Sequence, residues 1–217
     1  MNKKKQLNIT LLVAATLLSA HCNADKLEIK PFFNPDNQSA AFFKKSVAFN
    51  SASDFLTVQE KSWEYETDLK HEKAGNKKAT NCKTLKKLLK EGYTAAKDYE
   101  YGFVNAQSLT CSMWKEMATF KPYSVSYMND LSLNKDFATK APARFALLIS
   151  NEEIKKAESA KSWDSMSQIK KIDLVNDMRA IYYDSTGGIQ RLTLMAKGDY
   201  NGDGIEDRLL FMENSVE

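Results

Sequence analysis

The chain has 217 residues, of which 43% are hydrophobic and 27% are charged. This composition is that of an ordinary globular protein, and it excludes a mostly disordered chain, a collagen-like chain and a polytopic membrane protein. The formal net charge is +3, but setting aside Lys3, Lys4 and Lys5 leaves 28 of the 31 basic residues against 28 acidic ones. The sequence therefore predicts no nucleic-acid partner, because a nucleic-acid-binding protein normally carries a basic field.

Residues 1–24 have the pattern of a signal peptide. The three lysines precede a mostly apolar run over residues 9–20, which is too short to span a bilayer as a helix. Cys22-Asn23-Ala24 places small residues before Asp25, so we expect cleavage there, with cleavage after Ala20 as the alternative. A buried N-terminal helix is the other interpretation of the apolar run. The leader indicates a periplasmic or secreted bacterial protein with no transmembrane segment in the mature chain.

The three cysteines have different expected fates. Lipoproteins are cut before a lipid-bearing cysteine that follows a small residue, and His21 in that position argues against lipid anchoring through Cys22. Removal of the leader then leaves Cys82 and Cys111. An even pair of cysteines in an oxidising compartment usually closes into a disulfide, so we expect this bond; two free buried thiols are the alternative.

The first part of the mature chain is assigned from its composition and periodicity. Residues 25–38 are polar and contain Pro31 and Pro35, which indicates an extended arm. The following elements are a docking segment over 40–49, a short helix over 53–60, a half-exposed strand over 62–69 and a polar loop over 70–80.

Asn81 predicts the start of a helix over 82–91, which Gly92 ends. The lysines along one side of this helix favour a solvated face over an anion-binding patch. A short strand over 99–104 and a helix over 107–120 follow. Residues 141–149 are expected to form another apolar helix, and Ser150 with Glu153 matches a capping box that starts the next one.

After about residue 172 the pattern changes to β-branched and aromatic runs separated by turns. These runs predict an antiparallel β-meander over about 176–213. The expected fold class is therefore α+β, with a mainly helical N-terminal and middle part packed on the C-terminal meander. We expect residues 39–217 to form a single domain.

The segment 199–207 between the last two strands of the meander has a composition typical of a calcium loop. Oxygen-bearing side chains stand at its positions 1, 3, 5 and 9, and Gly204 occupies position 6. Ca²⁺ takes about six to eight oxygen ligands in flexible geometry. The expected ligands are the side chains of Asp199, Asn201, Asp203 and Asp207 and the backbone carbonyl of Ile205.

This loop resembles the D-x-N-x-D-G-x-x-D loops of FG-GAP and VCBS-like extracellular repeats, which also run into an apolar strand. The resemblance covers about 15 residues and implies a structural calcium-binding loop. Position 12 holds Leu210 where an EF-hand has a bidentate Glu, and the motif occurs once, so we expect neither an EF-hand nor a repeat propeller. An Asx-rich hairpin turn without metal is the alternative.

The sequence singles out no catalytic residue. His71 is the one histidine outside the leader, and the chain contains neither a P-loop nor a dinucleotide fingerprint. We therefore expect a non-catalytic exported protein whose partner is either an envelope component or another protein. The alternatives are a carboxylate-dependent hydrolase acting on envelope polymers, and a secreted effector or inhibitor that binds another protein.

Overall fold

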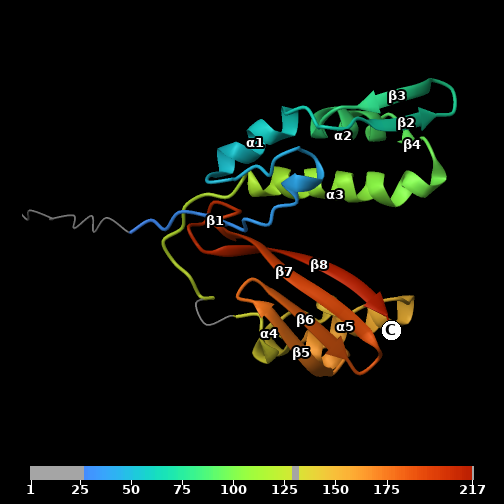
Figure 1. Ribbon diagram of the computed structural model, residues 1–217. Coiled ribbons are helices and arrows are strands. Elements are labelled where there is room, and N and C mark those ends of the chain that lie inside the picture. Colours follow the sequence, from blue (N-terminus) through green and yellow to red (C-terminus); the bar gives the residue numbers. More distant parts are fainter. Residues whose placement is uncertain (1–26, 129–131, 217) are drawn as a thin grey trace, which may run out of the picture.

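The computed structural model describes residues 27–128 and 132–216 (Figure 1). The predicted signal peptide of residues 1–24 and its cleavage site before Asp25 lie outside the described residues. The described chain contains both helices and antiparallel sheets, which confirms the α+β class. Within those residues, no helix has the length and apolar character needed to cross a membrane.

An N-terminal body combines three helices with a small antiparallel sheet. Its elements are α1 (Ala52–Glu60), β2 (Thr67–His71), β3 (Gly75–Ala79), α2 (Cys82–Lys90), β4 (Thr94–Ala95) and α3 (Tyr101–Met117). The small sheet has the order β3-β2-β4. The helices begin where the sequence supplies caps: the Asn81 side chain accepts a hydrogen bond from the Thr84 amide at 2.8 Å, and Ser51 and Asp54 form a capping box.

Two sequence predictions for this body are wrong. The polar loop expected over 70–80 is a hairpin, in which β3 pairs with β2 and Gly75 has a φ of 72° at the turn. Most of β3 is exposed, so the strand carries no apolar alternation to reveal it. The strand expected over 99–104 is instead a short 3₁₀ turn that leads into α3, because Val104, Gln107 and Cys111 form one buried helical face.

The C-terminal part of the chain forms a five-stranded antiparallel sheet that also includes two residues of the predicted arm. Its strands are β1 (Phe32–Phe33), β5 (Ile169–Asn176), β6 (Arg179–Asp184), β7 (Gly188–Gly198) and β8 (Asp207–Val216). β7 is central, with β6 along one edge and β8 along the other. β1 joins the β6 side of β7 at Ala196 and Lys197. The meander is therefore longer than predicted and starts at Ile169.

Short helices cover the face of the large sheet that is turned away from the N-terminal body (Figure 1). They are α4 (Lys135–Lys140), α5 (Asn151–Ser159) and α6 (Trp163–Met166). The predicted capping box is confirmed, since Ser150 Oγ accepts from the Glu153 amide at 3.1 Å and Glu153 Oε2 accepts from the Ser150 amide at 3.0 Å. The helix expected over 141–149 is reduced to a 3₁₀ turn, because the backbone becomes extended at Ala146.

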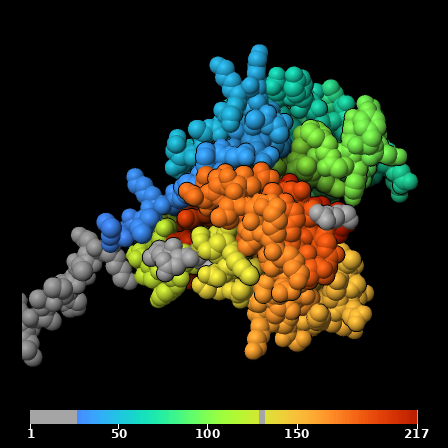
Figure 2. All heavy atoms as spheres, turned by 60° about the horizontal axis from the view of Figure 1, so that its bottom comes forward, coloured from blue at the N-terminus to red at the C-terminus, as the bar shows by residue number. Residues whose placement is uncertain are grey.

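Two hydrophobic cores lie on opposite faces of the large sheet, and both include β7. A register shift between Leu194 and Ala196 gives β7 one extra residue, Met195. Met195 and Ala196 belong to the first core, with Phe55, Leu69 and Trp114, whereas Leu192 belongs to the second, with Phe137, Trp163 and Tyr182. In the space-filling view the N-terminal body lies directly against the strands (Figure 2).

Candidate functional site

The loop between β7 and β8 is organised around the Asp199 carboxylate. Its Oδ1 accepts hydrogen bonds from the amides of Gly202 at 2.6 Å and Asp203 at 3.2 Å, and its Oδ2 accepts from the Gly204 amide at 2.9 Å. The two glycines have φ values of 87° and 78°, which turn their amides toward the carboxylate without a side-chain penalty. Backbone hydrogen bonds in both directions between Asp199 and Lys121 anchor the start of the loop.

The other predicted ligands also accept backbone amides. Asn201 Oδ1 accepts from Asp203 at 2.9 Å, Asp203 Oδ1 from Ile205 at 2.8 Å, and Asp207 Oδ2 from Tyr200 at 2.9 Å. In the described part of the chain, no three or more His, Cys, Asp or Glu side chains are grouped as for a metal ion. The observed geometry is that of consecutive Asx turns. The donor set, three carboxylates with an amide oxygen and a carbonyl, has the hard-oxygen chemistry of Ca²⁺, so calcium binding stays a prediction.

Burial disfavours ionisation of Asp199, but the amides of Gly204, Gly202 and Asp203 and the Lys121 ammonium outweigh it. Together they lower the pKa of this carboxyl from its usual value. Asp199 is therefore charged at neutral pH, where it holds the loop closed.

A buried ion pair joins Glu206, near the end of the loop, to Arg208 at the start of β8. Glu206 Oε1 accepts from Arg208 Nε at 2.8 Å, and the two side chains are only 3% and 11% exposed. Arg208 also donates to the backbone carbonyl of Met128. Burial disfavours ionisation of Glu206, but hydrogen bonds from Ser126 and Arg208 and the nearby Lys197 charge outweigh it, so the pKa of Glu206 is lowered.

Cys82 and Cys111 form a disulfide that joins the start of α2 to α3, with Cα atoms 5.4 Å apart. Both cysteines are buried in the first core. This confirms the predicted bond. His71 lies at the end of β2, where its Nδ1 accepts from the amides of Lys73 and Ala74 at 3.1 Å each.

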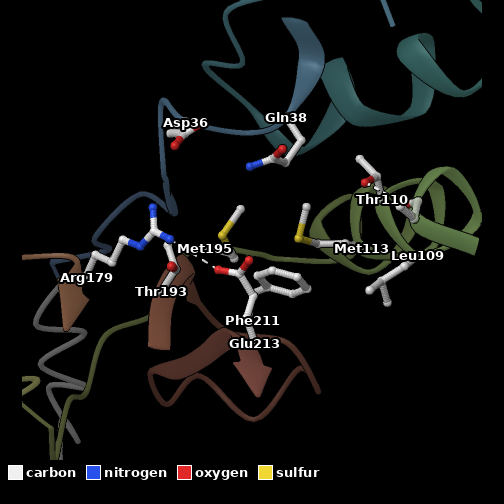
Figure 3. Close-up of a pocket in the computed structure, with 11 residues that line it drawn as sticks. Asp36, Gln38, Leu109, Thr110, Met113, Arg179, Thr193, Met195, Phe211 and Glu213 are labelled. Atoms are coloured by element: carbon white, nitrogen blue, oxygen red, sulfur yellow. Dashed lines mark hydrogen bonds and ion pairs between the residues drawn. The ribbon is translucent and has the colours of Figure 1, made fainter. Parts of the chain in front are cut away.

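A cleft of about 270 Å³ opens between α3, the large sheet and the arm (Figure 3). Thr193 of β7 pairs with Arg179 on β6 and with Phe211 on β8, so these three side chains form one row on the same face of the sheet. Glu213 is two residues further along β8 and lies on that face too. On α3, four residues at helical spacing form the opposite wall: Ala106, Leu109, Thr110 and Met113.

Polar groups of the arm and the sheet meet in this cleft. Arg179 Nη2 donates to Glu213 Oε2 at 3.2 Å, whereas Arg179 Nε is buried and has no hydrogen-bond partner among the described residues. Gln38 has a φ of 63°, rare for a residue other than glycine, and Figure 3 shows its amide directed into the cleft beside Asp36. Buried Asn37 fixes this part of the arm, since its carbonyl accepts from Trp114 Nε1 at 2.9 Å.

Comparisons with known proteins provide no relative from which to transfer a function. No family model, curated protein or solved structure matches this chain.

The sequence did not single out the cleft, because its residues come from the arm, one helix and three strands. The available signal was weak: strand alternation places Arg179, Thr193 and Glu213 on one face only once the strand register is known. The disulfide and the loop, by contrast, are visible in short stretches of sequence.

Proposed function

We propose that this chain is an exported, non-catalytic binding protein whose ligand enters the cleft between α3 and the large sheet. The cleft carries this proposal, because it combines a deformable apolar wall with polar side chains that form no hydrogen bond or ion pair with another described residue. Met113, Met195 and Phe211 supply the apolar surface, and the Asp36 carboxylate and the Gln38 amide supply the polar groups. The Cys82–Cys111 disulfide supports export, since such bonds persist in oxidising compartments.

The hydrolase alternative requires two carboxylates facing each other across a substrate. Asp36 and Glu213 both line the cleft, but the Glu213 carboxylate is ion-paired with Arg179. Binding is therefore the function that this arrangement supports better.

A neutral apolar dye tests whether the cleft binds a ligand. We expect Nile red fluorescence to rise on mixing with the protein, and Leu109→Lys to abolish the rise, because it places a charge at the mouth of the cleft. Leu56→Lys is the matched control: Leu56 lies on α1, outside the cleft residues, and is 60% exposed, against 53% for Leu109. Equal dye binding by both variants would contradict the proposal.

We also propose that the loop of residues 199–207 binds Ca²⁺ as a structural ion. The loop begins four residues beyond Met195, about 13 Å along an extended strand, so an ion there does not reach a ligand in the cleft. The carboxylates of its three proposed ligands Asp199, Asp203 and Asp207 repel one another when no cation is present. An ion that binds only the folded state stabilises it by about 2.7 kcal/mol at a concentration 100-fold above its dissociation constant.

Thermal melts test the calcium proposal. We expect the melting temperature in millimolar Ca²⁺ to exceed that in chelator by several degrees, and Mg²⁺ to do less because it prefers strict octahedral geometry. Asp203→Ala should abolish the difference, since no neighbouring side chain replaces its carboxylate in the turn. Asp68→Asn, an exposed change on β2, is the control. Identical melts of the wild type with calcium and with chelator would show that the loop is a polar turn only.

A further inference from the structure

The size of the cleft restricts what can enter it. Its volume of about 270 Å³ is below the range of about 300–1,000 Å³ typical of sites for drug-sized molecules. It suits one large side chain or a group of similar size. The unbranched thioethers of Met113 and Met195, next to the Phe211 ring, adapt to apolar groups of different shape. The cleft therefore favours an apolar anchor that belongs to a larger molecule.

The charges in the cleft favour a cationic neighbour for that anchor. Asp36, Glu213 and Arg179 are its ionisable residues, so its formal charge is −1. Arg179 is paired with Glu213, whereas the Asp36 carboxylate makes no ion pair with a described residue. A basic group on the ligand would complement Asp36.

The outer edge of β8 adjoins this cleft and offers free backbone groups. β8 is 10 residues long and, among the described residues, pairs with β7; over its residues 209–216 no other backbone hydrogen bond is found within that part of the chain. The opposite edge strand, β5, is protected by two register irregularities and by Lys170 and Lys171. The β7–β8 ladder has one register irregularity, whose extra residue belongs to β7, and the Phe211 and Glu213 side chains of β8 line the cleft.

The exposed stripe of α3 supplies a second wall for a chain lying on this edge. Phe103 and Leu109 are both 53% exposed, and Phe103 precedes Ala106 by one helical turn on the same side of α3. In Figure 3 the labelled α3 residues lie on one side of the cleft and Arg179 of the sheet lies on the other. Phe211 lies between the α3 residues and Arg179.

From these four observations we propose that the ligand is an extended polypeptide segment of a partner protein that adds a strand to β8. One apolar side chain of the segment fills the cleft, and a basic side chain two residues away, on the same face of the added strand, pairs with Asp36. This inference rests on the proposed binding function and specifies its ligand.

Fluorescein-labelled octapeptides of alternating Thr and variable residues test the proposal by fluorescence anisotropy. A peptide with a central Leu and Lys two positions away should bind at least about tenfold more tightly than its Glu counterpart, and the same peptide with Ser for Leu should not bind. Asp36→Asn should reduce the preference for Lys over Glu, whereas the control Asp68→Asn should leave it unchanged. N-methylation of alternate backbone amides in the Leu/Lys peptide should abolish binding, because strand addition needs those amides.

The remaining outcomes separate this inference from the proposed function. Equal binding of the Lys and Glu peptides, or full binding of the N-methylated peptide, would overturn the inference. If Nile red enters the cleft but no peptide binds, the ligand is not a polypeptide and only the inference fails. If neither binds, both fail. A dimer of the protein alone in sedimentation velocity, dissociated by Leu109→Lys but not by Leu56→Lys, would assign the β8 edge to a second copy of this chain and overturn the inference.

Discussion

Replacing both Cys82 and Cys111 with alanine is expected to lower the free energy of unfolding by about 3–4 kcal/mol. The bond closes a loop with a sequence separation of 29 residues. In the chain-entropy model, opening this loop raises the conformational entropy of the unfolded chain, which lowers the free energy of unfolding by that amount. The same bond fixes α2 against α3 within the first core. Alanine is chosen over serine because serine would place two hydroxyl groups in a buried site.

Urea unfolding of the wild type and the double variant measures this effect. Adding reductant to the wild type in the same titration should bring its midpoint toward that of the variant, while reductant should not change the variant. Thiol labelling of denatured, unreduced protein from the periplasm should find no free thiol. Two labelled cysteines in that material would contradict the bond.

The second large effect is expected at Glu206. Glu206→Gln removes the charge that faces Arg208 in a buried site, and breaking a buried ion pair on one side typically costs about 3–5 kcal/mol. The exposed pair of Glu66 and Lys78 is the matched control, because its distance is also 2.8 Å while its side chains are 49% and 60% exposed. Glu66→Gln should change stability little, since water and salt screen an exposed pair.

The Glu206 effect should also depend on pH. The folded-state pKa of Glu206 is lowered from its usual value, so its stabilising contribution is complete above the unfolded-state pKa and is lost as the pH falls through the folded-state pKa. The stability difference between wild type and Glu206→Gln should therefore be largest near neutral pH and shrink below about pH 4. A difference that stays constant from pH 7 to pH 3 would contradict the charge-based explanation.

The parts of the fold that short-range patterns specify could be predicted. Ser150 with Glu153 defined a capping box, Asn81 defined the start of α2, and β-branched and aromatic runs separated by turns defined β6 to β8. The exposed β3 escaped detection because its pairing with β2 leaves no pattern of burial. The start of α3 was misread because the aromatic run of residues 99–104 has strand composition, while its buried positions follow helical spacing.

The candidate sites divide in the same way. The disulfide followed from cysteine number, and the loop of residues 199–207 followed from spacing alone, although calcium binding remains a prediction. The cleft could not be found, because it depends on how far β8 is shifted along β7 and on where the arm crosses α3. The left-handed backbone at Gln38 is also set by buried contacts of its neighbours Asn37 and Ser39, which the sequence does not reveal.

The position of β7 in both cores couples the unfolding of the two halves of the molecule. Met195 and Ala196 are buried on the face of the sheet that packs against the N-terminal body, and Leu192 is buried on the opposite face. All three belong to β7, which also pairs with β6 and β8. Unfolding of either core would disrupt the hydrogen bonds of β7 with its neighbouring strands, on which the other core depends. The two halves are therefore coupled into one cooperative unit, and neither is expected to persist as an independently folded fragment after the other has unfolded.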